Sequence, residues 1–208
     1  MDETLFPHLC AAPAPGFATL ADQAAAAEAW ETPRWAIAAI LDVEIMTAAI
    51  LDPCCGAGAL TVAAEDYGYE VLAMDLYDWG FSARTGVDFL TLKTADLPER
   101  FQGGDFTVLM NPPFSRACEF VDRAHALGAR KIVCFQRLAW RESGRRRAWW
   151  DARPPARVWL CGDRAHTWLF TIPPQDRKGG RFMPTAWFVW ERGHKGAEIG
   201  GTIWRNKS

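Results

Sequence analysis

The sequence lacks both a long apolar run and an excess of positive charge. No segment approaches the roughly 18 consecutive apolar residues that a membrane-spanning helix needs. The formal net charge is −2 and the isoelectric point is about 6.1, so only a local basic patch could attract an anionic partner. The first residues, MDETLFPHLC, are acidic, whereas a signal peptide begins with basic residues. We therefore expect a globular protein that does not associate with a membrane.

The sequence also lacks the cysteine spacings of a metal site or a disulfide framework. It has six cysteines but no CxxC pair, and no histidine lies at the spacing of a zinc site. Cys54 and Cys55 are adjacent and cannot readily bond to each other. We expect reduced, mostly buried thiols in an intracellular protein, and no bound metal.

Strand-like and helix-like segments alternate along the chain of 208 residues, half of which are apolar. We predict strands at 47–52, 70–75, 106–111 and 131–136, and helices at 31–42, 59–68 and 116–128. In the first helix, Thr32 is expected as the N-cap and Pro33 as the first helical residue. The alternation favours an α/β fold with a doubly wound, mostly parallel sheet. Two later strands, 157–162 and 185–193, have no helix between them and should pair antiparallel at one edge.

The stretch ILDPCCGAGAL joins the first predicted strand to a predicted helix. Gly56 and Gly58 allow a ligand to approach the backbone closely, and the helix start offers free N–H groups. Asp75 ends the next strand 19 residues after Gly56, which is the spacing of a carboxylate that holds ribose hydroxyls in dinucleotide folds. The GxGxxG pattern is broken, and Asp52 would repel a pyrophosphate but suit a cationic amino group. The alternative is a tight structural turn with an unrelated aspartate.

A second motif, NPPF at 111–114, ends the predicted strand of residues 106–111. The two prolines fix φ at their own positions and disfavour helix at Asn111, so the polar amide is held in a rigid setting. The structural alternative is a turn that only terminates the strand, because Asn and Pro are common in turns.

These motifs together resemble those of a known family. DPCCGAG at 52–58 resembles the cofactor loop of class I S-adenosylmethionine-dependent methyltransferases, and NPPF resembles their amino-methylating motif. ETP at 31–33 matches the upstream segment that touches the methionine end of the cofactor, and GVDFL at 86–90 looks like the loop that contacts the adenine ring. The C-terminal part is similar to small phage- and prophage-type adenine-specific DNA methyltransferases, so the resemblance covers residues 30–195.

The resemblance implies a Rossmann-like, seven-stranded catalytic domain at 30–195, with a lead-in at 1–29 and a tail at 196–208. We expect no separate target-recognition domain, so the recognised DNA site stays open, as does the choice between a monomer and a weak homodimer. The resemblance also implies S-adenosylmethionine as cofactor and a cytoplasmic location in a bacterial or phage-infected host cell. The cofactor-binding residues would be Thr32, Asp52, Pro53, Cys54, Gly56, Gly58, Asp75, Leu76, Asp88, Phe89 and Asn111.

The same resemblance gives the NPPF residues a catalytic role on the exocyclic amine of adenine in DNA. This amine is a poor nucleophile because its lone pair is delocalised into the ring. The side-chain oxygen of Asn111 and the carbonyl of Pro112 would accept its two N–H bonds and aim the lone pair at the methyl group. Pro113 would brace the turn, and the base would stack on Phe114. No strong general base is needed, because the nitrogen becomes acidic only after transfer.

An amine inside a duplex can be reached only if its base is flipped out of the stack. His166 and Trp168 could supply a second aromatic wall, although Trp168 could equally belong to the core. Seven arginines occur within 21 positions: Arg137, Arg141, Arg145, Arg146, Arg147, Arg153 and Arg157. We interpret this cluster, and Arg141, Arg145 and Arg146 in particular, as a strip that contacts DNA phosphates; the alternative is a solvated helix face.

Other functions stay open at this point. RNA adenine methylation and methylation of a glutamine amide in release factors use the same motif. The glutamine enzymes usually have Tyr as its last residue and a helical N-terminal domain, for which the roughly 30 residues before ETP leave little room. A catalytically inactive nucleic-acid-binding module with this fold is a further alternative. The intact cofactor and NPPF motifs argue against it.

Overall fold

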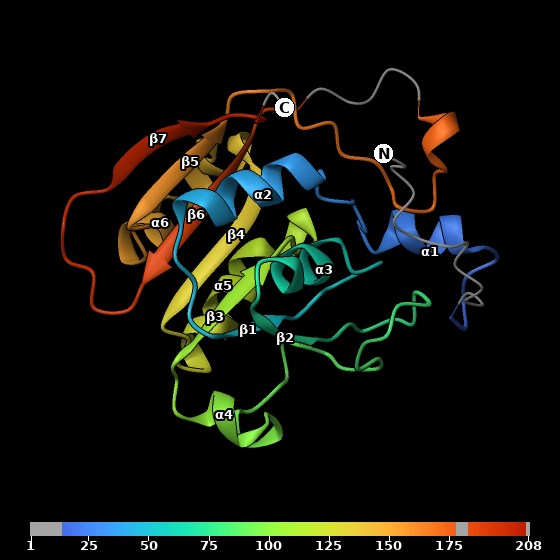
Figure 1. Cartoon of the computed structure of the whole chain (residues 1–208), viewed down its shortest axis with the longest axis horizontal. Coiled ribbons are helices and arrows are strands. Elements are labelled where there is room, and N and C mark those ends of the chain that lie inside the picture. Colours follow the sequence, from blue (N-terminus) through green and yellow to red (C-terminus); the bar gives the residue numbers. More distant parts are fainter. Residues whose placement is uncertain (1–13, 178–182, 207–208) are drawn as a thin grey trace.

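Seven strands form one sheet in the order β2-β1-β3-β4-β6-β5-β7 (Figure 1). The computed structural model describes residues 14–177 and 183–206. The strands are β1 (Ala49–Asp52), β2 (Glu70–Ala73), β3 (Phe106–Met110), β4 (Lys131–Arg137), β5 (Arg157–Cys161), β6 (Thr185–Glu191) and β7 (Ile199–Ile203). The α-helices are α1 (Leu20–Ala26), α2 (Arg34–Val43), α3 (Ala59–Asp66), α4 (Glu99–Gln102), α5 (Ala117–Ala126) and α6 (Arg147–Ala152). The predicted α/β class and the alternation of elements are confirmed.

Only β6 runs against the other strands of the sheet. β1 pairs in parallel with β2 and β3, and β3 pairs in parallel with β4. β6 is antiparallel to both β4 and β5, and β7 is again parallel to β5. The predicted antiparallel pairing of the two late strands is therefore confirmed. Its expected place at the sheet edge is wrong, because β6 lies inside the sheet.

The outermost strand on that side, β7, comes from the segment expected as a tail. Its sequence, IGGTI, has two glycines where a strand usually carries branched or aromatic side chains, so its pattern is weak. At Gly201 the space is taken by the Trp159 ring, since a β-carbon there would lie 2.4 Å from it. The indole of the neighbouring strand thus covers the glycine, and packing rather than local propensity places this strand.

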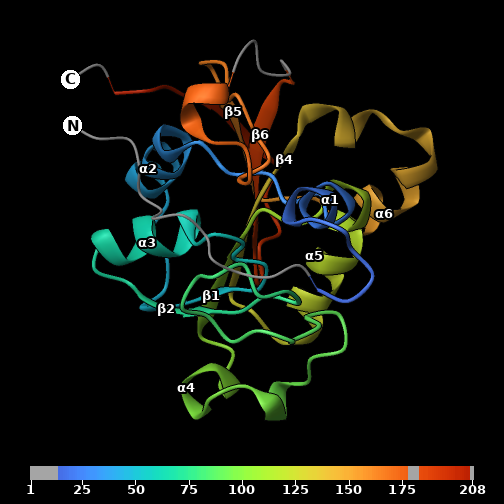
Figure 2. The same cartoon turned by 90° about the vertical axis from the view of Figure 1, so that its right-hand side faces the viewer.

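Side chains along β4 alternate between two apolar clusters, one on each face of the sheet. Ile132 and Cys134 belong to the cluster that contains residues of α5 and α6. Val133 and Phe135 belong to the cluster that contains residues of α2 and α3. Figure 2 shows these helix pairs on opposite sides of the sheet. A strand buried on both faces needs apolar residues at nearly every position, as in this doubly wound arrangement.

The start of α2 differs from the prediction. The helix begins at Arg34, and its N-cap is Pro33, with φ −60° and ψ 131°. Thr32 does not cap the helix, because its hydroxyl instead accepts a hydrogen bond from the side chain of Asn111. The local sequence predicted that the Thr32 side chain caps the helix. In the structure this side chain instead contacts Asn111, which lies far away in the sequence.

The five cysteines within residues 14–177 and 183–206 are free thiols. No group of three or more His, Cys, Asp and Glu side chains in this part of the chain could hold a metal ion. None of the helices described is long and apolar enough to cross a membrane.

Candidate active site

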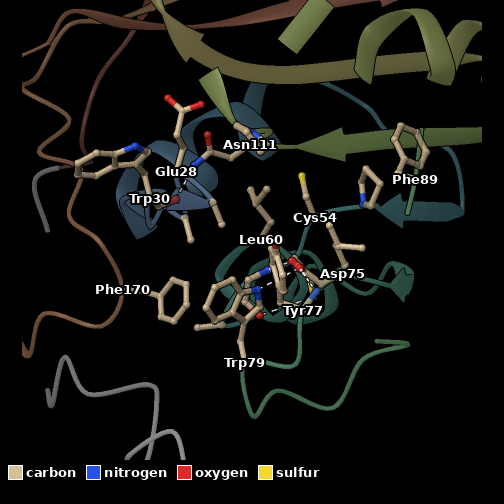
Figure 3. Close-up of a pocket in the computed structure, with 18 of the residues that line it drawn as sticks. Glu28, Trp30, Cys54, Leu60, Asp75, Tyr77, Trp79, Phe89, Asn111 and Phe170 are labelled. Carbon is tan, nitrogen blue, oxygen red and sulfur yellow. Dashed lines mark hydrogen bonds between the residues drawn. The ribbon is translucent and has the colours of Figure 1, made fainter. Parts of the chain in front are cut away.

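A cavity of about 260 Å³ opens beyond the carboxyl ends of β1 and β3. Its wall is formed by residues 26–32, here called the strap, by the loop after β1, by residues 75–89 and by Phe170 (Figure 3). All the predicted cofactor-binding residues except Asp52 and Gly58 line it: Thr32, Pro53, Cys54, Gly56, Asp75, Leu76, Asp88, Phe89 and Asn111. The motifs named from the sequence therefore meet around one cavity.

The loop after β1 needs glycine at two positions. Gly56 has φ +55° and Gly58 has φ +89°, a region that L-residues rarely adopt. Gly58 is also the N-cap of α3, and a β-carbon on it would lie 2.4 Å from the Phe81 ring. The two glycines allow the chain to turn sharply from β1 into α3, so that backbone of the loop faces the cavity.

Asp75 holds this loop in place. Its Oδ2 accepts a hydrogen bond from the Gly56 N–H at 2.9 Å. Its Oδ1 accepts from the Tyr77 N–H at 2.9 Å and from Trp79 Nε1 at 3.0 Å. Burial raises the pKa of this carboxyl, while the hydrogen bonds act in the opposite direction. Both oxygens already have protein donors, but a carboxylate can accept about four bonds in all, so capacity is left for a ligand hydroxyl.

Asp52 lies beneath the loop rather than in the cavity wall. Its side chain is 1% exposed, and its Oδ2 accepts a hydrogen bond from the Thr61 hydroxyl at 2.9 Å. Its Oδ1 has no partner among the described residues. Burial raises the pKa of Asp52 to about 7. Asp52 does not line the cavity, so its contact with a cationic group of a ligand stays a prediction.

Asn111 directly follows β3 and lines the cavity. Its Nδ2 donates to the carbonyl of Trp30 at 2.8 Å and to the hydroxyl of Thr32 at 2.9 Å. Its Oδ1 is buried and has no hydrogen-bond partner among the described residues. The two bonds made by the amide nitrogen fix the orientation of the group. As a result, Asn111 Oδ1 is a hydrogen-bond acceptor with a fixed orientation and with no donor among the described residues.

The rest of the NPPF motif divides between the cavity and the protein interior. Pro113 lines the cavity, but Pro112 and Phe114 do not. Phe114 is 6% exposed, and the Arg137 guanidinium lies over its ring, 4.8 Å from the ring centroid. The expected open stacking face of Phe114 is therefore covered in this structure.

The strap carries residues that sequence reasoning did not find. Glu28 has φ +51°, and no other described non-glycine residue has a positive φ. A left-handed L-residue costs about 1–2 kcal/mol. The Glu28 carboxylate accepts hydrogen bonds from the Ser115 N–H at 2.9 Å and from the Ser115 hydroxyl at 2.5 Å. These bonds tie the strap to the residue that follows NPPF and help to offset the strain.

The strap is held from its other side by the loop between β5 and β6. Trp30 forms an antiparallel bridge with Leu169, and the Glu31 N–H donates to the Trp168 carbonyl at 2.8 Å. Arg177 donates to the Glu31 carboxylate at 2.6 Å. Nothing in the local sequence of either segment predicts this pairing, because the two segments lie far apart in the chain.

Aromatic rings close the cavity on the side opposite Asn111 (Figure 3). Phe170 lines the cavity and meets Trp79 edge to face, with the ring centroids 4.8 Å apart. Tyr77 and Trp79 directly follow Asp75 in the sequence, so their position next to a named motif could have indicated them. The two rings predicted as a wall, His166 and Trp168, do not line the cavity; His166 is exposed and Trp168 is half-buried.

Acidic groups dominate the charge around the cavity. Among its described lining residues, Glu28, Glu31, Asp75 and Asp88 carry carboxylates, and Arg116 carries a guanidinium that pairs with Glu119. Such a lining disfavours a ligand rich in phosphate and favours one that carries positive charge.

Most of the predicted arginine strip is engaged within the protein. Arg141 pairs with Glu198 at 2.6 Å and lies over the Trp150 ring, while Arg146 donates to the Trp140 carbonyl. Arg145 is exposed and forms no ion pair within the described residues. Contact of this cluster with DNA phosphates stays a prediction.

Solved structures with a similar fold include two DNA-modification subunits. One is the type I restriction-modification system methyltransferase subunit from Streptococcus thermophilus, with a TM-score of 0.53 and 14% identity over 80% of this chain and 46% of that chain. Another is described as a modification subunit of a type I restriction enzyme from Vibrio vulnificus YJ016, with a TM-score of 0.53 and 12% identity over 81% and 45%. This chain thus spans about half the length of these two proteins.

A third similar structure, described as a hemolysin from Lactococcus lactis, has a TM-score of 0.56 and 12% identity over 80% of this chain and 89% of that chain. At identities this low, the similarity shows a shared fold and nothing more. No family model matches the sequence, and no curated protein matches it.

Proposed function

We propose that this protein transfers a methyl group from S-adenosylmethionine to the exocyclic amine of adenine in DNA. The observation that carries the proposal is the side chain of Asn111. Its oxygen is buried in the cavity wall without a partner, while its nitrogen is fixed by Trp30 and Thr32. A buried hydrogen-bond acceptor normally has a donor. We propose that an amine N–H of the substrate is the donor to Asn111 Oδ1.

The lining of the cavity suits S-adenosylmethionine in its charge and in its apolar surface. The cofactor carries a sulfonium and an ammonium group, and most of the charged side chains in the described lining are acidic. Phe89 and Phe120, whose ring centroids are 5.3 Å apart, offer apolar surface for a flat ring. Asp75 has spare acceptor capacity for ribose hydroxyls, and Gly56 brings backbone to the ligand. When bound, the cofactor supplies an electrophilic methyl group.

The chain's own residues have a limited task in this reaction. Asn111 accepts one N–H of the amine, and the Pro112 carbonyl is proposed to accept the other. Two acceptors on one nitrogen draw it toward a tetrahedral geometry and direct its lone pair at the methyl group. Because Pro112 and Pro113 fix the backbone, this alignment is prepared before the substrate binds.

The choice of DNA rests on the motif and on the described activity of proteins with this fold. Of the two similar proteins above, one is described as the methyltransferase subunit of a restriction-modification system and the other as the modification subunit of a restriction enzyme. Phe114 of the NPPF motif is proposed as a stacking ring once its face is uncovered, which a base can use and an aliphatic glutamine amide cannot use in the same way. Adenine in a duplex would have to be flipped to reach Asn111.

A labelling experiment tests the proposal. The protein is incubated with methyl-labelled S-adenosylmethionine and, in parallel, with DNA, RNA and a protein substrate that offers glutamine amides. We expect label in N6-methyladenine from DNA after nucleoside analysis. Label only in RNA or protein would reject the proposed substrate. Micromolar cofactor binding by calorimetry without any transfer would instead identify an inactive module.

A further inference from the structure

The ring of Phe114 is covered by a charged side chain. Arg137 is the last residue of β4, and its guanidinium carbon lies 4.8 Å from the centroid of this ring. Phe114 is 6% exposed, yet it belongs to neither of the two apolar clusters of the core. A ring that served only as core filler would be expected to pack within one of them.

Arg137, like Arg145 and Arg146, forms no ion pair within the described residues, and of these three it is the one that lies over the Phe114 ring. Arg141, Arg147, Arg153 and Arg157 each form an ion pair with an aspartate or glutamate. Within residues 14–177 and 183–206, Arg137 forms none, and its side chain is half-buried. A cation held beside the NPPF motif without a neutralising carboxylate is available to an anionic substrate group.

The contact between Arg137 and Phe114 can be exchanged at little cost. A guanidinium over a phenyl ring is held weakly at a partly hydrated site, whereas a nucleobase gains at least as much by stacking on the same ring. The displaced guanidinium can then form paired, charge-assisted hydrogen bonds with a phosphate, for which its planar fork is well suited. A nucleic acid offers the base and the phosphate together.

We propose that Arg137 is a substrate-binding residue that covers Phe114 in the free protein, yields this place to the target base and then binds a phosphate next to that base. The inference rests on the proposed function and deepens it. It makes a phosphate-bearing strand the preferred substrate over a free nucleoside or a side-chain amide.

Steady-state methyl transfer is measured with an adenine-containing oligonucleotide and with adenosine. The comparison separates binding of a phosphate by Arg137 from the transfer reaction itself. For Arg137→Ala we expect the KM for the oligonucleotide to rise about 10-fold, as for the loss of one good phosphate contact, and the log–log salt slope of binding to fall by about 1. The kcat should change less than about 3-fold, and transfer to adenosine should not weaken, because no phosphate is involved. Arg137→Lys should restore part of the KM and of the salt slope.

Arg130→Ala is the matched control. Arg130 directly precedes β4 at its opposite end, is exposed, and pairs with Asp105 at 3.0 Å. The Arg130→Ala substitution removes the same charge far from the NPPF motif. It should leave the KM for the oligonucleotide and the salt slope of binding unchanged. Thermal unfolding and cofactor calorimetry check that each variant is folded. Should Arg137→Ala not fold, Arg137→Gln, which keeps a planar end group without charge, carries the same expectations.

Two results overturn the inference while the proposed function stands. One is a wild type that methylates DNA and an Arg137→Ala variant with the same KM and salt slope. The other is a loss of kcat on both substrates with unchanged KM, which would mean that Arg137 only supports Phe114. A wild type that binds the cofactor but methylates no nucleic acid rejects the proposed function, and this inference with it.

Discussion

Replacing Asn111 by alanine removes a buried acceptor from the cavity wall together with the two bonds that orient it. In the native protein Nδ2 donates to the Trp30 carbonyl at 2.8 Å and to the Thr32 hydroxyl at 2.9 Å, and Oδ1 has no partner among the described residues. The variant leaves the cavity lined by the same cofactor-facing groups. It should therefore affect transfer much more than cofactor binding.

The size of the effect follows from the role of the missing oxygen. Loss of one preorganised polar group at a reaction centre slows catalysis about 100- to 1,000-fold. Thr32→Val is the graded comparison, since it removes one of the two orienting bonds and keeps the Asn111 oxygen. A single hydrogen bond contributes about 0.5–1.5 kcal/mol, so this variant should slow transfer by about 10-fold at most.

Asn111→Asp tests the orientation itself. The substitution places a carboxylate oxygen where Nδ2 now donates to the Trp30 carbonyl, so two acceptors would face each other at about the present 2.8 Å. Repulsion should rotate or expel the side chain, and we expect activity as low as for alanine together with a lower melting temperature.

Single-turnover transfer to an oligonucleotide, calorimetry with S-adenosylmethionine and thermal unfolding measure these effects. We expect the cofactor Kd of Asn111→Ala to stay within about 3-fold of the native value, because other groups form most of the cofactor wall. Full activity of this variant would refute the reasoning. An equal loss in Thr32→Val would also refute it, since the oxygen would then not be the decisive group.

Two further predictions concern the loop after β1. Burial raises the pKa of Asp52 from 3.8 to about 7 on folding, so the folded protein binds this proton more tightly and its free energy of unfolding falls as pH rises from about 4 to 7. The stability of Asp52→Asn relative to the native protein should therefore rise between pH 4 and pH 8, on the order of 4 kcal/mol in urea unfolding; a pH-independent difference contradicts this. Gly58→Ala, whose β-carbon would meet Phe81 at 2.4 Å, should lose more stability and cofactor affinity than Gly68→Ala, which has φ +86° but open space; equal losses would assign the effect to φ alone.

The parts of the site that could be predicted from the sequence are those formed by short motifs of consecutive residues. The glycines after β1 and Asn111 after β3 follow buried strands directly, and parallel strands bring their carboxyl ends to one edge of the sheet. Once the strands were identified, the convergence of these motifs followed from topology. The local chemistry of proline and glycine then specified the backbone at each position.

The remaining features depend on contacts that no local pattern encodes. Phe114 was expected to offer an open face, but the side chain of Arg137 on the next strand covers it. Asp52 ends β1 as predicted, yet its side chain is buried. Whether a side chain at a strand end faces the ligand or the interior depends on what packs over it, and that is decided by tertiary structure.

The strap shows how far such contacts reach. It presents the Trp30 carbonyl and the Thr32 hydroxyl to Asn111, and it also forms part of the cavity wall. The loop between β5 and β6 holds the strap through Leu169 and Arg177. Since the same segment closes the cavity and orients the acceptor, a disturbance of the distant loop reaches Asn111 through the strap. We therefore expect changes in the loop between β5 and β6 to alter both the cavity wall and the orientation of Asn111, although Leu169 and Arg177 lie far from Asn111 in the sequence.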